Sequence, residues 1–462
     1  MLKLNLETTV ALNEEFKKDI KLLFEQYQKY NRFDQSYYDR FNVKRGLRNA
    51  DGTGVLAGLS QICNVHGYMI NEGEKMPIDG ELIYRGINIH DIINGCATDN
   101  RYSFEETAWL LLMGFLPNQK QLDHFSAMLS RYRDLPDNFT EDMIMKAPST
   151  NIMNVLSRCV LALYTYDNNP EDTSIENVMR QSIQLIARMP SIMVAAYQVK
   201  KRVFDGRSMY LHNPRPDFST AQNILRLLRS DKQFTEEEAH LLDLCLVLHV
   251  EHGGGNNSTF TTRVLTSSGT DTYSAISAGI GSLKGPRHGG ASHKVSEMMT
   301  AIKEGVSNWD DDNEVKDFLV KIINKQAGDH SGLIYGMGHA VYTKSDPRAT
   351  ILKANAIKLA TGTEYEKEFK LLHSVERLAP DLLREKWGND RSVCANVDLY
   401  SGLVYRMLGI PEELHTPLFA TARTAGWCAH RMEEISSGGK IIRPAYKPIA
   451  QEQEYIPLSE RH

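Results

Sequence analysis

The chain has 462 residues, of which 42% are hydrophobic and 24% are charged, and its formal net charge is −5. These values are typical of a soluble globular protein whose core is large enough for one to three domains. The slight acidic excess argues against a nucleic-acid-binding surface, although it leaves room for a local basic cluster that binds a phosphorylated cofactor. No run of about 18 apolar residues occurs, so we expect no membrane span.

The cysteines and the N-terminal residues indicate a compartment. Six cysteines are scattered along the chain without a Cys-x-x-Cys pair, which disfavours a zinc ribbon or a disulfide framework and predicts free, mostly buried thiols. The first residues carry Glu7, Glu14, Glu15 and Asp19 and no long apolar run, unlike a signal peptide or an Arg-rich transit peptide. The sequence therefore predicts a cytoplasmic location.

Helical spacing dominates the chain. Apolar residues at steps of three and four predict helices around residues 22–27, 109–112, 152–165, 178–200, 219–230 and 236–250. One β-hairpin is expected within residues 61–85, where apolar segments at 67–70 and 81–84 flank turn-rich residues 71–74 and 77–80. The predicted fold is therefore mainly α with a small hairpin near the N-terminus.

Composition changes in the second half of the chain suggest domain boundaries. Residues 271–285 are rich in Ala, Ser and Gly at helical spacing, which predicts a tightly packed core helix that positions the following His288. Residues 293–330 are more charged, and apolar patterning resumes near Asn396, so boundaries are expected near both places. The acidic run Asp310–Asp312 is interpreted as a solvated helix start rather than a metal site.

His249 and His252 allow two interpretations. Three residues apart on a helix, they would share one face and could ligate a metal in a hydrolase. No third ligand follows, and the glycines of 253–255 indicate that the helix ends near His252. The favoured interpretation makes His249 a packed structural residue and lets His252 contact substrate. The glycine run lacks the Gly-Lys-Ser/Thr ending of a phosphate-binding P-loop.

His288 and Asp398 each have a structural and a functional interpretation. A lone histidine is more often structural, but Gly285-Pro286 and Gly289-Gly290 flank His288, and we expect the second pair to open access beside it. Asp398 stands in an otherwise apolar register, where a carboxylate caps a helix, is paired or has a function.

The segment around His339 combines two kinds of chemistry. His339 directly follows Gly336-Met337-Gly338, and a histidine can exchange a proton near neutral pH. Arg348 follows nine residues later, and a guanidinium can bind a carboxylate through two parallel hydrogen bonds. This pairing suggests chemistry on a carboxylate substrate.

In order and separation these segments resemble the citrate synthase family, over a span from Tyr84-Arg85-Gly86 to the Lys440–Pro444 motif. The resemblance implies an almost entirely α-helical homodimer, with a large domain of residues 1–290 and 396–462 and a small domain of residues 291–395. It also implies condensation of acetyl-CoA with oxaloacetate and water to citrate and CoA. Neither a metal nor a redox cofactor is expected, and two domains should close over oxaloacetate to exclude water.

The resemblance assigns three catalytic roles. Asp398 would remove a proton from the acetyl methyl group. His288 would donate a hydrogen bond to the thioester oxygen, and a helix N-terminus close by would favour its neutral form. His339 would polarise and protonate the ketone of oxaloacetate.

The same resemblance assigns binding residues. Around oxaloacetate it places His252, Arg348, Arg423 and, from the other subunit, Arg443; the coenzyme A contacts are Met337, Gly338 and Arg391. Without the resemblance, each arginine could be a surface ion pair worth under ~1 kcal/mol.

Two positions depart from the family pattern. The usual Asp-His-Glu reads Glu251-His252-Gly253, and Thr343 stands where some members have a CoA-binding arginine. A 2-methylcitrate synthase that uses propionyl-CoA is the alternative within the family, because one methylene changes discrimination by only ~1–3 kcal/mol. A non-catalytic binding protein is disfavoured, since all three catalytic positions hold reactive residue types.

Overall fold

The computed structural model describes residues 14–49, 52–72, 74–388 and 392–461. The chain forms two compact units: Met1–Leu56 with Pro444–His462, and Ala57–Arg443. The second unit spans every predicted site residue. Within the described ranges, no helix is long and apolar enough to cross a membrane.

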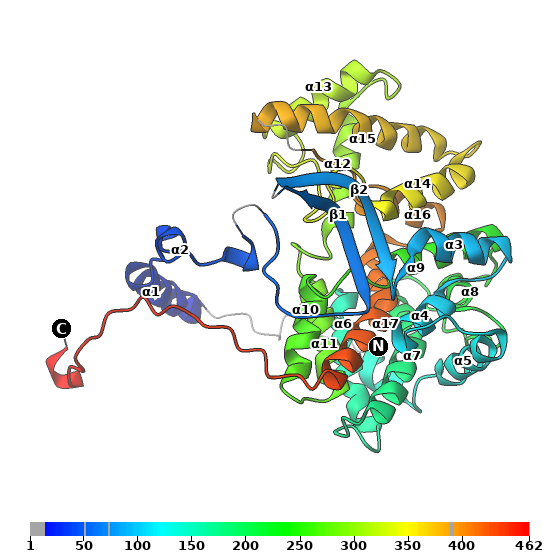
Figure 1. Cartoon of the computed structure of the whole chain (residues 1–462), viewed down its shortest axis with the longest axis horizontal. Coiled ribbons are helices and arrows are strands. Elements are labelled where there is room, and N and C mark those ends of the chain that lie inside the picture. The colour runs from blue at the N-terminus through cyan, green and yellow to red at the C-terminus, as the bar shows by residue number, and fades with distance from the viewer. Residues whose placement is uncertain (1–13, 50–51, 73, 389–391, 462) are drawn as a thin grey trace. The chain divides into compact units, whose positions relative to one another are not determined.

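The unit of residues 57–443 is mainly helical, which confirms the predicted fold class (Figure 1). Its α-helices in chain order are α3 (Ile89–Thr98), α4 (Phe104–Met113), α5 (Gln119–Tyr132), α6 (Ile152–Ala162), α7 (Ile175–Val203), α8 (Thr220–Leu228), α9 (Glu236–His249), α10 (Asn257–Ser267), α11 (Thr272–Leu283), α12 (Ala291–Gly305), α13 (Asp312–Ile323), α14 (Pro347–Ala360), α15 (Glu366–Trp387), α16 (Asp398–Met407) and α17 (His415–Ser436). Short helical segments lie at η3 (Thr140–Met145), η4 (Leu163–Tyr166) and η5 (Glu412–Leu414).

Helix α17 is central to the core of this unit. It packs against α4, α7, α9, α10 and α11 and buries nearly all its side chains, including Trp427. The predicted close packing of α11 is confirmed, because a Cβ added to Gly279 would lie 2.6 Å from Thr262 Oγ1. Helix α17 carries the predicted site residue Arg423, and α9 ends three residues before His252.

The helix boundaries follow local sequence signals. Helices α8 and α9 begin with capping boxes, in which Ser219 and Thr235 accept the N–H of the residue three positions on. Helix α9 ends at His249, three residues before the predicted end. The acidic run is a helix start, as predicted, because α13 begins at Asp312 and Asp311 caps it.

The predicted hairpin is confirmed but is longer than expected. Strand β1 (Cys63–Asn71) pairs antiparallel with β2 (Glu74–Tyr84), and β3 (Ile87–Asn88) extends the sheet. Residues 77–80, predicted as turn-rich, lie inside β2 instead. The glycine there, Gly80, serves packing, because a Cβ added to it would overlap the carbonyl oxygen of Ser345.

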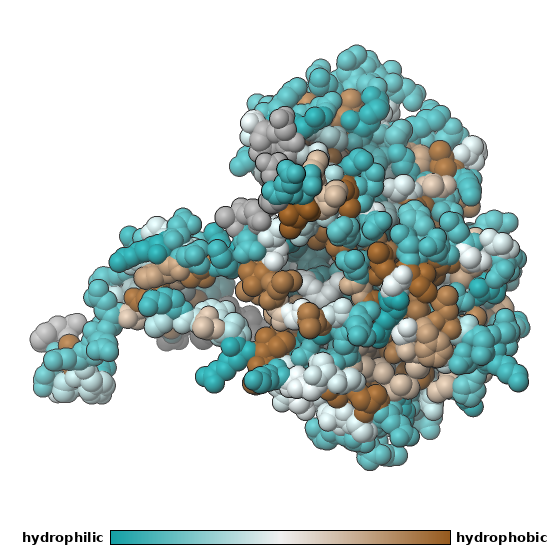
Figure 2. Space-filling view, viewed as in Figure 1, coloured by the Kyte–Doolittle hydropathy of each residue, from teal (hydrophilic) through white to brown (hydrophobic). Residues whose placement is uncertain are grey.

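Hydrophilic side chains dominate the surface over α13 and α15 on the face shown in Figure 2. Helix α13 contacts both α12 and α15, and α14 contacts α15. This agrees with the more charged composition that begins after His288. All six cysteines are free, and every one except the half-buried Cys63 is buried, as predicted.

The other unit contains α1 (Glu14–Tyr30), α2 (Ser36–Arg40) and the short helical segments η2 (Arg45–Leu47) and η6 (Leu458–Glu460). The predicted first helix is present as α1. Its apolar side chains at Ile20, Leu23 and Tyr27 are exposed. Within this unit, Lys447 Nζ lies 5.5 Å from the centre of the Phe41 ring.

Candidate functional site

Backbone hydrogen bonds join the segment before His339 to the segment before Asp398. The Gly338 N–H donates to the Cys394 carbonyl at 2.8 Å, and the Asn396 N–H donates to the Gly336 carbonyl at 2.9 Å. The Asn396 side chain donates to the Gly338 carbonyl at 2.9 Å. Two reactive side chains 59 positions apart in sequence are therefore held on adjoining backbone segments.

The hairpin supports the loop that carries His339. The Tyr342 hydroxyl donates to the Glu81 carbonyl at 3.1 Å. A Cβ added to Gly67 would lie 2.8 Å from the Val341 carbonyl oxygen, so only glycine permits this approach. The small sheet thus forms a rigid support for the loop from 339 to 345.

His339 is held with a defined ring orientation. Its Nδ1 accepts hydrogen bonds from the backbone N–H groups of Val341 at 3.0 Å and Tyr342 at 3.1 Å. Two donors directed at Nδ1 oppose a proton there, so the neutral ring carries its proton on Nε2. The ring stacks on Tyr342, and its centre lies 5.1 Å from that of His252. His339 can therefore donate from Nε2.

His288 is held by the N-terminus of α10, in agreement with the expected helix N-terminus. Its Nε2 lies 3.2 Å from the Ser258 backbone N–H donor and 2.9 Å from Ser258 Oγ. Burial, with a smaller effect of Arg423, lowers the pKa of His288 to about 4. The ring is neutral at physiological pH, and with Nε2 accepting, its proton is on Nδ1.

The sequence suggested that Gly289 and Gly290 open access beside His288, but both glycines are closely packed against backbone atoms. A Cβ added to Gly289 would overlap the Leu283 carbonyl oxygen, and one added to Gly290 would lie 2.9 Å from the Pro286 backbone. The glycines instead allow the turn between α11 and α12 to close tightly. Because His288 lies in this turn, the turn fixes the position of its backbone.

Asp398 does not cap a helix. It is the first residue of α16, and its own backbone N–H donates to the Asn396 side chain at 3.0 Å. Burial raises the pKa of Asp398 to about 6, while Arg348 opposes the shift and Asp346 adds to it. No described residue donates a hydrogen bond to its carboxylate. The group is a carboxylate suited to accept a proton near neutral pH.

Two arginines beside these groups are buried, so neither is a surface ion pair. Arg348 is clamped by Asp346, with Nε 3.1 Å from Oδ1 and Nη2 2.8 Å from Oδ2. Arg423 donates from Nε to the His249 carbonyl at 2.7 Å. Burial lowers the pKa of Arg423, and Glu251 opposes that shift.

Arg423 Nη2 and His252 Nε2 are buried and lack a hydrogen-bond partner among the described residues. Burial and the nearby Arg348 hold the pKa of His252 well below its usual value. An unpaired buried donor is costly, by about 1–3 kcal/mol for a neutral group. Together with the two guanidinium charges, these donors fit a small ligand that carries carboxylate and other acceptor oxygens.

His249 is a packed structural residue, as favoured from the sequence. Its Nε2 lies 2.5 Å from the Tyr405 hydroxyl, and its ring centre lies 4.4 Å from that of Phe419. The His252 ring instead packs against His339. The two histidines therefore do not face a common metal position, and the metal-dependent hydrolase interpretation loses its basis.

A buried polar chain behind His252 was not found from the sequence. Glu251 Oε1 accepts from His430 Nε2 at 3.0 Å and from the Gly253 N–H at 2.6 Å, and His430 Nδ1 lies 2.7 Å from Arg263 Nη1. Burial acts to raise the pKa of Glu251, but His430 and Arg423 outweigh it and hold the pKa below its usual value. Such long-range pairing leaves no local pattern.

Asp346 and Ser258 were also missed. Asp346 both caps α14 and holds Arg348, and an Asp-Pro pair at a helix start is a signal that could have revealed it. Ser258 has no comparable signal, because it meets His288 only in the fold.

The structure gives fewer contacts for the other predicted binding residues. Met337 pairs with Ala395 in an isolated bridge, so Met337 and Gly338 border the site through their backbone. Arg443 is exposed and has no contact with the other predicted residues in the described part of the chain. Arg391 lies outside the described residues.

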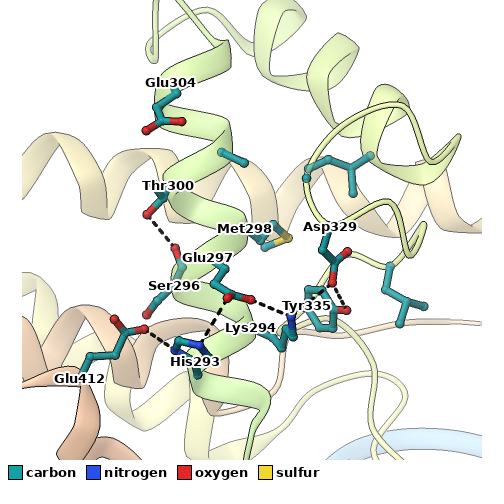
Figure 3. A pocket seen from close by; sticks show the side chains of 14 residues that line it. His293, Lys294, Ser296, Glu297, Met298, Thr300, Glu304, Asp329, Tyr335 and Glu412 are labelled. Atoms are coloured by element: carbon teal, nitrogen blue, oxygen red, sulfur yellow. Dashed lines mark hydrogen bonds and ion pairs between the residues drawn. The ribbon is translucent and has the colours of Figure 1, made fainter. Parts of the chain in front are cut away.

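A cavity of about 490 Å³ lies along α12, which begins three residues after His288 (Figure 3). Lys294 Nζ is held there 2.7 Å from Glu297 and 3.6 Å from Asp329, and His293 lies 2.7 Å from Glu412. Four carboxylates and one lysine line this cavity. Their charge does not suit the phosphates of coenzyme A.

The family model described as "Citrate synthase, C-terminal domain" matches residues 49–445. A citrate synthase from Synechocystis is 33% identical over 88% of this chain and 92% of its own length. A protein named 2-methylcitrate synthase 1 from Corynebacterium glutamicum is 32% identical over 91% of this chain and 98% of its own length.

A solved structure is similar over the same span. It is the ternary complex of carboxymethyl coenzyme A and oxaloacetate with citrate synthase from Thermoplasma acidophilum, with a TM-score of 0.73 and 26% identity. The match covers 91% of this chain and 99% of that one.

Proposed function

Because the chain belongs to the citrate synthase family and is therefore an acyltransferase, we propose that it condenses acetyl-CoA with oxaloacetate and water. The products are citrate and free CoA. The observation that carries this proposal is the position of Asp398, a carboxylate with a raised pKa near the buried Arg348, in a cluster where Arg423 Nη2 and His252 Nε2 lack partners among the described residues.

Asp398 acts as the base. The α-carbon of a thioester is a very weak acid, so the carboxylate removes its proton only if the developing enolate is stabilised. His288 supplies that stabilisation by donating from Nδ1 to the thioester oxygen. One such donor is worth about 3–4 kcal/mol in a water-excluded site.

His339 acts on the second substrate. Its Nε2–H polarises the ketone of oxaloacetate and gives that oxygen a proton as the carbon–carbon bond forms. Water then cleaves the thioester, which releases CoA. The neutral form of both histidines is supported by the N–H donors that each ring accepts.

Oxaloacetate binds through its two carboxylates. The unpaired Nη2 of Arg423 and the unpaired Nε2 of His252 are the donors that it satisfies, and Arg348 supplies the second positive charge. The fold already buries these groups, so their desolvation does not have to occur during binding. This favours an anion that pairs with them.

Two features of the assembly belong to the same proposal. The protein is a homodimer in which Arg443 reaches the oxaloacetate of the partner subunit, and its exposure leaves it available for that contact. Residues 291–395 form a small domain that closes over oxaloacetate and excludes water from the enolate.

A 2-methylcitrate synthase is the second candidate, because a relative that carries this name matches the chain as extensively as those named citrate synthase. The comparison of kcat/KM for acetyl-CoA and propionyl-CoA decides between them. A higher value for propionyl-CoA would replace the first candidate by the second.

The proposed reaction is tested by release of free thiol from acetyl-CoA. Folded protein should release thiol only when oxaloacetate is present, with one citrate formed for each thiol. Thiol release without oxaloacetate, or none from either acyl-CoA, would overturn the proposal.

A further inference from the structure

Glu251, the residue directly before His252, is a carboxylate with no exposed surface. Its Oε1 accepts the Gly253 N–H at 2.6 Å, so the side chain closes a short loop around His252. Gly253 has a φ of +82°, a conformation that glycine adopts without strain. A side chain that accepts the N–H two residues on, as Asp does in an Asx turn, fixes the residue between. Glu251 therefore restricts the backbone that carries His252.

Two helices hold the Glu251 carboxylate in place. From α17, the buried His430 donates from Nε2 to the same Oε1 at 3.0 Å. From α10, Arg263 Nη1 donates to His430 Nδ1 at 2.7 Å, so the neutral imidazole carries its proton on Nε2, where it can donate. Arg263 is held in turn by Glu433 at 2.8 Å and Glu434 at 3.0 Å. The carboxylate thus has a buried and well-supported position.

The backbone of Glu251 is restrained as well. The Tyr84 hydroxyl, on β2, donates to the Glu251 carbonyl at 3.0 Å. A Cβ added to Gly426 on α17 would lie 2.3 Å from Glu251 Oε2 and 2.4 Å from the Val250 carbonyl oxygen. This close contact leaves the loop no room to move towards α17.

The His252 ring depends on this loop for its direction. The ring packs edge to face on His339 and Tyr342, with centres 5.1 and 5.6 Å away. No described residue bonds its buried Nε2. Ring packing alone does not direct a hydrogen-bonding nitrogen, and a binding group has to be held close to its productive geometry. The backbone that Glu251 restricts supplies that restraint.

From these contacts we propose that Glu251 is a positioning residue for oxaloacetate. Through its bond to Gly253 and the support of His430, it directs His252 Nε2 at the substrate. This inference rests on the proposed function, in which His252 contacts oxaloacetate. It adds a buried residue that acts through His252 and does not touch the substrate itself.

Calorimetric titration of the full-length protein with oxaloacetate, without acyl-CoA, tests the proposal. Glu251→Ala removes both contacts of Oε1, so oxaloacetate affinity should fall roughly tenfold, the worth of one well-directed hydrogen bond. Glu251→Gln keeps an oxygen that accepts from Gly253 and His430, so its affinity should stay within about threefold of wild type. In turnover, Glu251→Ala should raise KM for oxaloacetate and leave KM for acetyl-CoA unchanged.

Glu105→Ala is the matched control for the loss of a buried carboxylate. Glu105 Oε1 also accepts a backbone N–H, that of Thr220 at 2.7 Å, but it joins α4 to α8, which carry none of the proposed site residues. Both alanine variants should melt at a lower temperature than wild type, because each leaves a buried N–H without its acceptor. Only Glu251→Ala should bind oxaloacetate more weakly, and equal weakening in Glu105→Ala would show a general structural effect and overturn the proposal.

A second variant keeps the test decisive if Glu251→Ala does not fold. His430→Phe retains a ring in the same space but cannot donate to Glu251 Oε1, so oxaloacetate affinity should fall by about three- to tenfold. Wild-type affinity in the variant that folds, or an equal loss in Glu251→Gln, would overturn the proposal.

The titration also separates this inference from the proposed reaction. Wild type that binds oxaloacetate but releases no thiol from acetyl-CoA would contradict the condensation, while the comparison of the variants would still decide the role of Glu251. Wild type that binds no oxaloacetate would overturn both.

Discussion

At the scale of single residues, the three reactive side chains are tuned by different neighbours. His288 and His339 each accept backbone N–H groups at one ring nitrogen, which leaves the other nitrogen as a donor. Asp398 has no such donor among the described residues, and burial shifts its pKa towards neutrality. The fold thus places two imidazoles that can donate and one carboxylate with a raised pKa near the buried Arg348 and Arg423.

The pH dependence of turnover follows from the raised pKa of Asp398. The base must be ionised, so kcat/KM for acetyl-CoA should be constant above neutrality and fall tenfold per pH unit below about pH 6. His288, with a pKa of about 4, stays neutral over this range and adds no inflection. Steady-state rates across this range, at saturating oxaloacetate, provide the measurement. An inflection near the ordinary carboxyl value, around pH 4, would contradict the assignment.

Arg423 should contribute to oxaloacetate binding more than to folding. Arg423→Gln removes the guanidinium whose Nη2 has no described partner, so oxaloacetate affinity should fall by at least a hundredfold, about 3 kcal/mol. The rise in melting temperature that oxaloacetate causes in wild type should also disappear. Arg85→Gln is the control, because Arg85 is satisfied by the Leu111 carbonyl. An unchanged thermal shift in Arg423→Gln would reject this role.

At the scale of elements, the hairpin and the loop from 339 to 345 act as one support. The contact depends on glycines, since a Cβ on Gly80 would overlap the Ser345 carbonyl oxygen and approach the Tyr342 ring. Backbone atoms cannot yield as a flexible side chain can. The position of His339 therefore depends on a residue about 260 positions earlier in the chain.

Gly80→Ala should destabilise the protein by about 1–3 kcal/mol, the cost of forcing extra volume into a packed contact. The rate should fall as well, because His339 lies on the displaced loop. Gly95→Ala is the matched control: a Cβ at this exposed position in α3 meets nothing within 4 Å, and alanine favours a helix. Denaturant unfolding measures both. Equal stability of the two variants would refute the close contact.

Much of the helical architecture was predictable from sequence because amphipathic spacing and capping signals are local. The helices that became α6, α7, α8 and α9 follow their apolar periodicity, and the acidic run before α13 is a helix start as expected. Residues 77–80 were misjudged as a turn, since Pro and Gly there serve a strand that meets a distant loop. Which distant segments lie side by side can be learned only from the folded structure.

The same distinction applies to the site. The resemblance of motifs predicted His252, His288, His339, Arg348 and Asp398 as site residues. The fold brings the segments of His252, His339, Arg348 and Asp398 together, while their roles stay predictions. Ser258 and the hydrogen-bonded set of Glu251, His430 and Arg263 were missed, because each acts through a partner far along the sequence. Asp346 was missed although its partner Arg348 is only two residues away. The roles of Arg443 and Arg391 stay predictions.

At the scale of the whole molecule, the proposed homodimer with a site shared between subunits leads to a complementation test. His288→Ala and Arg443→Gln should each be inactive alone. In a reassociated equal mixture, half of the dimers are mixed, and each has one site with both residues intact. Activity should return to about a quarter of wild type. Mixtures that stay at the parental level would show that Arg443 does not act across the interface.

The central claim is that Asp398 is the base of an oxaloacetate-dependent condensation. The most direct measurement compares thiol release from acetyl-CoA with oxaloacetate binding in wild type and Asp398→Ala. We predict that the variant loses thiol release by a factor of about 10²–10⁴ or more, while its oxaloacetate affinity changes little. Retained thiol release, or an equal loss of binding and turnover, would contradict the claim.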